Sequence, residues 1–495
     1  MADFVLNVEV FEKRMGRVLE SWSKDNTNEG LWNGADVLVL AAGKSTAASA
    51  ASKPVTMQTW LFDVELPDCV ILATSAKELT VCSSQKKVDI LRQLARDGSP
   101  FTFDFLVRNK ADGNAANWSA MLAKIANSRQ GSRLGICGGE KAETLLTGKF
   151  AKSFFAAIRG AGVPLVAIDT ALSAELVTKD EVETANIRKA AELAAAVVNS
   201  VTVKRIEVVL DKGTAVPHAQ LSTEAANAFT SPSAAGLTGF DDELADMSYT
   251  PMIQSGADVR AGALVAPSGA PLAKRGVFLV SMGGRYNLYN ANVARSVLVN
   301  ATDKVDASFA ILRAAHQFCI SAATPGKTFA ALYEETLAFV EAKEEGLGRK
   351  LAANFGSSIG IELVEPDYVL GPSCTARIRT GMVLNISLAF RKLSDKKSKR
   401  AEMRKFELAL ADTVLVAPDG PVNLTAAVPY EIVYVLDDTA ETEAARAARL
   451  AEAKAALDAQ AVLDERLRKR GSAQTETSAA DEQRIRDHQS ELAQK

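Results

Sequence analysis

A short segment near the N-terminus contains residue types that could hold a phosphate. Ala41–Thr46 reads Ala-Ala-Gly-Lys-Ser-Thr and follows an apolar run that predicts a buried strand. A phosphate-binding loop of this kind needs another glycine five residues earlier, because its backbone N–H groups must converge on the phosphates. That position is Leu38, inside the predicted strand. We therefore expect no nucleotide site in this segment.

Histidines and nucleophiles form no recognisable catalytic set. His316 falls in a predicted helix over 307–320, His218 in a polar loop, and His488 near the end of the sequence. No Gly-x-Ser-x-Gly elbow lies between a strand and a helix. Metal centres need clustered carboxylates, imidazoles or thiolates, and the apolar segment Val280–Tyr286 contains no carboxylate. The sequence predicts no catalytic residue, no metal and no other cofactor.

A basic cluster separates two predicted strands in the second half of the chain. We interpret it as a solvated loop, and contact with an acidic partner is an alternative. The cluster lacks the interleaved aromatic residues of proteins that bind single-stranded nucleic acid. Its members are Arg391, Lys392, Lys396, Lys397, Lys399, Arg400, Arg404 and Lys405.

The elements that would position these residues fall into two lobes. The first lobe alternates strands with helices, which is typical of an α/β lobe. Its predicted strands cover 35–40, 69–74, 78–83 and 133–137, and a helix covers 86–96. A long helical pattern over 179–203 follows, and we place the lobe boundary at residue 176.

The second lobe combines helices with strands that alternate as antiparallel strands do, which predicts an α+β architecture. Helices are expected over 222–229 and 307–320, and strands over 277–282, 361–363, 382–389 and 408–416. From residue 438 onward the composition favours a charged helical tail with a polar linker.

Bulk properties exclude several classes of protein. The chain has 495 residues, 47% of them hydrophobic and 24% charged, with a formal net charge of -3. This composition is globular and gives no global reason to expect nucleic-acid or membrane binding. The N-terminus lacks the apolar core of a signal peptide, and no run of about eighteen apolar residues could span a bilayer. Five widely spaced cysteines indicate free thiols in a reducing compartment.

Four segments of the second lobe resemble the pita-bread fold of the creatinase and methionine aminopeptidase family. Val280–Arg295 is similar to the family's ligand-bearing hairpin and Asn354–Glu365 to its Gly-His-Gly turn. Gly381–Leu388 and Leu408–Val416 are similar to its two late strands. The resemblance implies where metal ligands would stand, and this chain has neutral residues there: Ser281, Asn292, Ser357, Ser387 and Ala411, with Val364 in place of a second catalytic histidine.

Matches in order along nearly the whole chain resemble a narrower family, the large subunits of the FACT histone chaperone. Gln58–Asp68, Ser84–Lys87 and Pro251–Gly256 carry the resemblance, as do Ala411–Val414 and Arg484–Ala493. It implies three regions: a creatinase-like lobe over 1–176, a pita-bread lobe without metal ligands over 177–437, and a charged tail over 438–495 that leads toward a dimerisation domain.

The same resemblance implies a non-catalytic interaction module in the nucleus, on chromatin, that binds histones H3–H4 or their tails during transcription, replication and repair. Ser84, Lys86 and Lys87 are candidate histone-binding residues. The small FACT subunit would bind through regions beyond this chain. Two alternatives stay open: an active peptidase or amidase that uses unrecognised residues, and a docking scaffold for replication or transcription factors. Neither sequence-specific nucleic-acid binding nor membrane binding is expected.

Overall fold

The structure is a computed structural model. It describes residues 4–436 apart from residues 26, 28–29, 45–51, 129–132, 257–258, 263 and 401–402. The tail predicted from residue 438 onward therefore lies outside the described residues, with His488 and the Arg484–Ala493 match. Ser45 and Thr46 of the glycine-lysine segment also lie outside them.

A six-stranded mixed sheet forms the centre of the first lobe. Its strand order is β4-β3-β2-β1-β5-β6, in which β1 pairs antiparallel with β2 and parallel with β5. The sheet is therefore mixed, with parallel and antiparallel neighbours. The strands are β1 (Val37–Ala42), β2 (Cys69–Thr74), β3 (Glu78–Ser83), β4 (Thr102–Val107), β5 (Leu134–Ile136) and β6 (Leu165–Ala167).

Helices cover both faces of this sheet because its strands are apolar on both sides. Leu38 and Leu40 belong to one buried cluster, whereas Val37 and Val39 belong to another, as the alternation of side chains along a strand requires. The helices are α1 (Val8–Lys24), α2 (Lys53–Phe62), α3 (Gln85–Leu91), α4 (Ala115–Ala126), α5 (Ala142–Leu145), α6 (Lys149–Gly160) and α7 (Asp169–Leu176).

The second lobe opens with a long helical segment that begins at a capping box. The Asp180 side chain accepts from the Glu183 backbone N–H, and the Glu183 carboxylate accepts in turn from the Asp180 backbone N–H. Helix α8 (Glu181–Ala196) continues through a π-helical stretch, Val197–Val203, into α9 (Lys204–Lys212). The helical segment is thus longer than the predicted 179–203. Helix α10 is His218–Phe229.

A nine-stranded sheet carries the rest of this lobe. Its main path is β11-β12-β13-β10-β9-β7, and β8, β14 and β15 pair with β9, β13 and β10. The strands are β7 (Ala245–Met247), β8 (Met252–Gln254), β9 (Gly276–Tyr286), β10 (Tyr289–Val299), β11 (Gly356–Ser358), β12 (Val383–Ser394), β13 (Lys405–Ala417), β14 (Gly420–Asn423) and β15 (Ile432–Tyr434).

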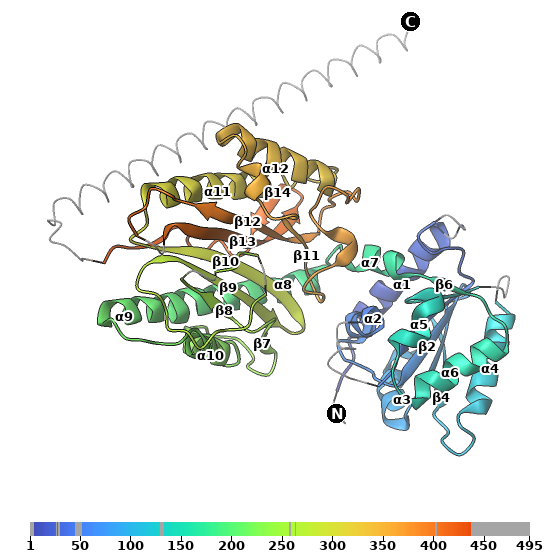
Figure 1. The fold of residues 1–495 in the computed structure, drawn as a ribbon. Coiled ribbons are helices and arrows are strands. Elements are labelled where there is room, and N and C mark those ends of the chain that lie inside the picture. Colours follow the sequence, from blue (N-terminus) through green and yellow to red (C-terminus); the bar gives the residue numbers. More distant parts are fainter. Residues whose placement is uncertain are drawn as a thin grey trace, which may run out of the picture. The chain divides into compact units, whose positions relative to one another are not determined.

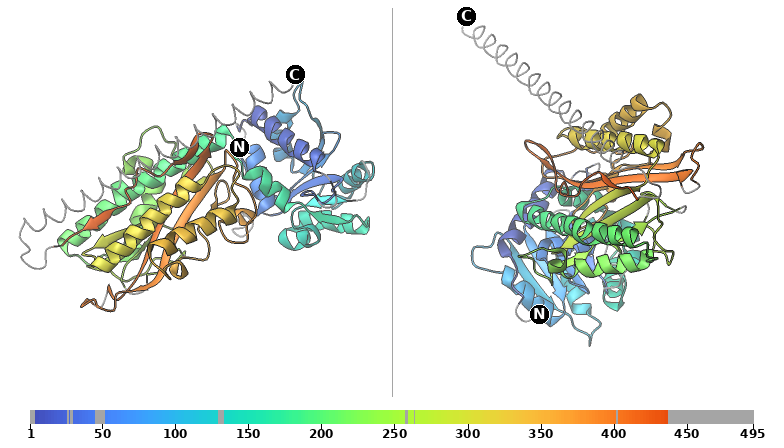
Figure 2. Two further views of the ribbon diagram at one scale, coloured as in Figure 1. Left: turned by 90° about the horizontal axis from the view of Figure 1, so that it is seen from above. Right: turned by 90° about the vertical axis from the view of Figure 1, so that its left-hand side faces the viewer.

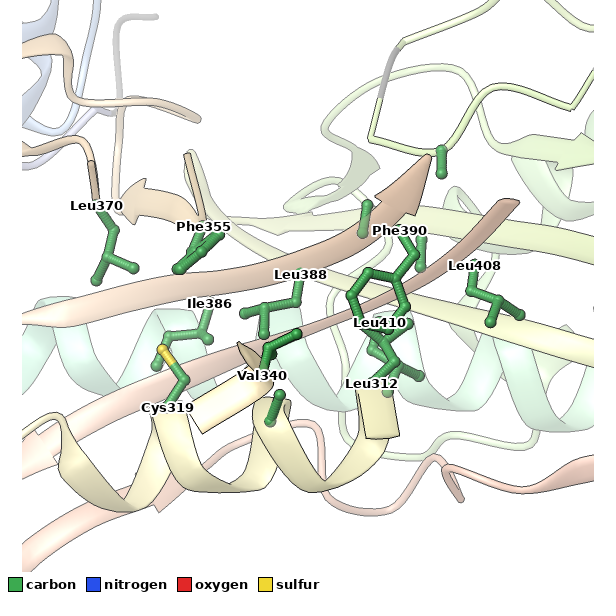
Figure 3. Packing of buried hydrophobic residues seen from close by; sticks show 14 of the residues in the cluster. Leu312, Cys319, Val340, Phe355, Leu370, Ile386, Leu388, Phe390, Leu408 and Leu410 are labelled. Carbon is green, nitrogen blue, oxygen red and sulfur yellow. The ribbon is translucent and has the colours of Figure 1, made fainter. Parts of the chain in front are cut away.

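Helices line the sheet in two groups (Figures 1 and 2). Helix α8 lies along β9 and β10, α11 (Asp303–Ala322) covers β12 and β13, and α12 (Phe329–Lys343) packs against α11. Figure 3 shows Leu312 and Cys319 of α11 against Leu388 and Leu410 of the strands. Burying such side chains stabilises the fold by roughly 1.5–3 kcal/mol each. This core holds β12 and β13 in place.

Ion pairs connect residues of the two lobes, and residues up to Tyr434 form one compact unit. Arg14 Nε of α1 lies 2.8 Å from Asp180 Oδ2 at the start of α8, and little of either side chain is exposed. Lys53 Nζ lies 2.6 Å from Glu362 Oε2. The expected boundary at residue 176 stays a prediction.

Two sequence-based expectations were wrong, and strand β4 was not predicted. The segment 361–363 forms bends rather than a strand. The strand that pairs with β12 in this region is β11, which ends three residues before this segment. Strand β4 was missed because Thr102–Val107 lies on the outermost position of its sheet and is only half-buried. His218 is not in a polar loop: it begins α10, is buried, and its ring nitrogens hydrogen-bond Ser255 and Ser268.

In the part of the chain that the structure describes, no helix is long and apolar enough to cross a membrane. The five cysteines are free thiols, four of them buried.

Candidate functional site

The sheet register places three candidate positions in one row across four neighbouring strands. Ser281 of β9 is opposite Ala294 of β10, and Ala294 is opposite Ala411 of β13. Ala411 is opposite Ser387 of β12. Side chains directly opposite each other on adjacent strands share a face of the sheet. Residues far apart in the sequence therefore meet on one surface.

This surface forms the floor of a cavity of about 310 Å³, which we call the cleft. Ser281, Ser387 and Ala411 line it together with Asn292, Ser357 and Val364. All six positions singled out from the sequence thus come together in one place. Whether they correspond to metal-ligand positions of the related enzymes stays a prediction, but their convergence is what that prediction requires.

Tyr249, which the sequence did not single out, lies at the centre of the polar floor. Its hydroxyl lies 2.8 Å from Ser281 Oγ and donates to Asn292 Oδ1 over 2.5 Å. Burial raises the pKa of the Tyr249 phenol, against a smaller opposing effect of the Ser281 hydrogen bond, so the hydroxyl stays a neutral donor. Gly283 makes room for the ring, since a Cβ there would lie 2.6 Å from Tyr249 Cε1.

Asn292 links the tyrosine to the next strands. Its Nδ2 donates to Asn385 Oδ1 over 3.0 Å, and its backbone N–H donates to Thr413 Oγ1 over 2.8 Å. The Thr413 hydroxyl donates back to the Asn292 carbonyl. Ser281, Tyr249, Asn292 and Asn385 therefore satisfy much of one another's hydrogen-bonding capacity, as buried polar groups must.

The side chains that line the cleft do not fit a divalent metal ion, the cofactor that the resemblance to aminopeptidases would imply. Such ions need carboxylates or imidazoles that neutralise the charge, and the candidate positions offer only hydroxyls, an amide and apolar side chains. No group of three or more His, Cys, Asp and Glu side chains among the described residues could hold a metal ion. No metal-dependent step can be derived from these residues.

A buried ion pair lies beneath the floor, next to Ala411. Arg295 Nη2 donates to Asp412 Oδ1 over 2.8 Å, and both side chains are fully buried. The guanidinium also donates to the carbonyls of Pro429, Ala411, Val428 and Ala294. Thr425 donates to the same carboxylate oxygen. Arg295 is thereby saturated and neutralised, so it fixes the strands rather than offering a charge to the cleft.

His316 lies beside this pair without becoming its partner. Its Nε2–H donates to the Ile386 carbonyl over 3.0 Å, and Nδ1 lies 3.7 Å from Asp412 Oδ2. Burial is the main effect that lowers the pKa of His316; Asp412 and the Ile386 carbonyl oppose it, and Arg295 adds to it. Despite the nearby carboxylate, His316 is therefore neutral at pH 7 and packs as a core side chain.

The candidate histone-binding residues lie elsewhere, at the junction of β3 and α3 in the first lobe. Ser84 is the N-cap residue of α3, and Lys86 is exposed. Lys87 is half-buried, its ammonium donates to the Pro67 carbonyl, and burial lowers its pKa. None of the three lines the cleft, and their role in binding stays a prediction.

Sequence reasoning missed Tyr249, Asn385 and Arg260, which also line the cleft. Asn385 could have been found, because it stands two residues before Ser387 and so shares its face of a strand. Tyr249 and Arg260 lie in irregular segments, where no periodicity indicates which way a side chain points.

Comparisons with known proteins match the two lobes separately. Residues 6–171 match the FACT complex subunit SPT16 N-terminal lobe domain, and residues 185–418 match metallopeptidase family M24. Among curated proteins, FACT complex subunit SPT16 of Dictyostelium discoideum is 32% identical over 438 residues, 86% of this chain and 40% of that protein. The Arabidopsis thaliana protein of the same name is 28% identical over 85% of this chain. The chain thus spans about 40% of the length of these relatives.

Solved structures agree on the fold. The N-terminal domain of FACT complex subunit SPT16 from chickpea has a TM-score of 0.77 and 24% identity, covering 87% of this chain and all of that one. X-Pro aminopeptidase from Thermotoga maritima has a TM-score of 0.57 and 14% identity, covering 81% of this chain and 98% of that one. In the order and fold of its two lobes, the chain therefore resembles the SPT16 N-terminal domain: residues 6–171 are similar to its N-lobe and residues 185–418 to the M24 fold.

Proposed function

We propose that this chain is a non-catalytic interaction module of a nuclear, chromatin-associated histone chaperone, with histones H3–H4 or their tails as its partners. The kinship with SPT16 supports the chaperone assignment. The cleft of the second lobe holds a peptide segment of a protein partner without cleaving it. The small FACT subunit and replication or transcription factors are further proposed partners of the larger assembly.

One observation carries the non-catalytic part of the proposal: the polar floor is neutral and bonded to itself. Peptide hydrolysis in this fold needs a metal-bound water or a general base close to the scissile bond. The cleft contains no carboxylate and no histidine among its described lining residues. What remains is a cavity of about 310 Å³ with hydrogen-bonding and apolar walls, a size and composition suited to binding.

Isothermal titration of the chain with H3–H4 tests the histone assignment. We expect saturable binding, weakened by Lys86→Glu if the β3–α3 junction contributes to it. The control is Lys110→Glu, which reverses another exposed lysine of the same lobe. Absence of heat, together with no competition by histone tail peptides, would contradict histone binding by these lobes.

An active peptidase is the second candidate, favoured by the M24 match and the likeness to X-Pro aminopeptidase. An X–Pro dipeptide assay with added Mn²⁺ or Co²⁺ separates the two. We expect no turnover above that of a sample with EDTA. Turnover that disappears on Asn292→Leu, a variant that keeps the side-chain volume but removes the amide from the floor, would overturn the non-catalytic proposal.

A further inference from the structure

The charges around the cleft indicate what kind of peptide segment it accepts. Its described lining residues include two arginines, Arg260 and Arg295, and no acidic residue. Arg295 is neutralised by Asp412, whereas Arg260 is exposed at the rim. The cleft therefore has one available charge, and it is positive.

Three carboxylates that stand near lining residues in the sequence are committed to other partners. Glu362 precedes and Glu365 follows the lining residues Leu363 and Val364, but they pair with Lys53 and Lys179 in buried ion pairs. Glu407, two residues before Ala409, uses both oxygens to accept the backbone N–H groups of Ala261 and Lys392. A lysine or arginine side chain that entered the cleft would lose water without gaining a counter-charge, which is unfavourable.

The rim also offers apolar surface. The side chains of Leu264 and Val364 are 69% and 52% exposed, and both line the cleft. Large apolar side chains left exposed together at a concave site mark a place where an apolar side chain of a partner can be buried. An apolar residue next to an acidic one matches this rim and Arg260.

The positive charge continues away from the cleft along the same strands. β12 and β13 carry Ser387 and Ala411 into the cleft and then extend into the basic cluster. We call this end of the two strands, with the basic residues from Arg391 to Lys405, the basic hairpin. At the transition, Arg391 donates to the carbonyls of Ala261 and Gly262, and Gly262 is itself a lining residue. Beyond it, Lys392, Lys396, Lys397, Lys399, Arg400, Arg404 and Lys405 are exposed.

We propose that the cleft and the adjoining basic hairpin bind an acidic peptide segment that carries a large apolar side chain, and not a lysine- or arginine-rich tail. The apolar side chain lies between Leu264 and Val364, one carboxylate faces Arg260, and further carboxylates follow the hairpin. This inference rests on the proposal that the cleft holds a peptide segment. Contacts with cationic histone surfaces then lie outside the cleft. An apolar rim favours a protein segment over duplex nucleic acid, whose backbone offers phosphates but no apolar anchor.

Fluorescence anisotropy with labelled peptides tests this on the full chain. One probe is a twelve-residue Asp/Glu peptide with a central Leu-Phe pair, and a second has every acidic residue replaced by Lys. A duplex DNA of similar charge is the third probe. At low salt we expect the acidic peptide to bind more tightly than the other two, and binding to weaken as salt screens the charges.

Matched variants locate the binding. We expect Arg260→Glu and Leu264→Asp each to weaken binding of the acidic peptide by about fivefold or more. Lys110→Glu and Leu145→Asp are the controls, because they make an equivalent charge reversal and the same Leu-to-Asp change at exposed residues of the first lobe. Circular dichroism of each variant checks that the fold is kept.

The outcomes separate this inference from the proposed function. Tighter binding of the lysine peptide, lost on Leu264→Asp, would overturn the acidic specificity while supporting a peptide-binding cleft. Tighter binding of duplex DNA that depends on the hairpin but not on Leu264 would overturn the choice of a peptide partner. Failure of both peptides to bind would remove the inference together with the peptide-binding role of the cleft.

Discussion

The hydroxyl of Tyr249 donates a hydrogen bond of 2.5 Å to Oδ1 of Asn292. This contact joins an irregular segment before β8 to the second strand of the central hairpin, and it lies on the floor of the cleft. It turns a set of unrelated polar side chains into one connected network, because Tyr249 also contacts Ser281 and Asn292 also contacts Asn385.

Removing that hydroxyl should be costly. We expect Tyr249→Phe to lower the free energy of unfolding by about 1 kcal/mol, because Asn292 Oδ1 and Ser281 Oγ each lose a hydrogen-bond partner. Urea denaturation followed by circular dichroism measures it. Tyr289→Phe is the control: among the described residues its buried hydroxyl has no hydrogen-bond partner, so its loss should be neutral or stabilising. Equal effects of the two variants would contradict this account.

Gly284 should tolerate no side chain. A Cβ at this position would lie 2.3 Å from the Ala190 carbonyl oxygen of α8, and neither backbone can move without disturbing the sheet. We expect Gly284→Ala to destabilise by about 2 kcal/mol or more. Gly269→Ala, where nothing lies within 4 Å of the added Cβ, should stay within about 0.5 kcal/mol of the parent. Thermal unfolding of both variants measures the two changes in stability. A Gly284→Ala protein as stable as the parent would show that α8 does not pack closely against β9.

The Arg295–Asp412 pair should behave as a buried pair. We expect Asp412→Ala to destabilise by about 3–5 kcal/mol, because it leaves an uncompensated guanidinium in the core. The surface pair Arg285–Asp246, with side chains 39% and 41% exposed, provides the comparison. Asp246→Ala should change stability by at most about 1 kcal/mol. If calorimetry showed that Asp412→Ala destabilises the protein by less than about 1 kcal/mol, another group would have to neutralise the Arg295 guanidinium.

Stability should fall on mild acidification. Because burial lowers the pKa of His316 and of His218 below the ordinary value, the folded protein binds fewer protons than the unfolded chain. The stability that neutral histidine contributes is complete above the unfolded pKa of about 6.5 and is lost as pH falls toward the folded pKa.

The urea midpoint of the parent should therefore be lower at pH 5.5 than at pH 7.5. His316→Gln keeps a donor for the Ile386 carbonyl, and it should reduce this difference, leaving the part due to His218. An unchanged difference in the variant would show that His316 does not contribute to it.

Particular elements show how far prediction from the sequence can reach. Strands β1, β2, β9 and β13 were predicted from the sequence. Each contains a run of apolar residues that is long enough to indicate a buried strand without knowledge of its neighbours. The edge strand β4 is half-buried and the three-residue β11 is short, so neither gives a local signal. Segment 361–363 alternates apolar and charged residues as a strand can, but the Asn290 side chain donates to the Ile361 carbonyl and the segment forms bends.

The sequence by itself determined the residue types at the candidate positions: hydroxyls, an amide and apolar side chains rather than carboxylates and histidine. Only the tertiary structure decided that Ser281, Ser387 and Ala411 form one row, since the pairing register links strands that are distant in the chain. The tertiary structure also places Tyr249 and Arg260, which lie in irregular segments, at the cleft. Residue type is a local property, whereas hydrogen bonding and the sign of the cleft's charge depend on which residues meet and which acidic groups are already paired.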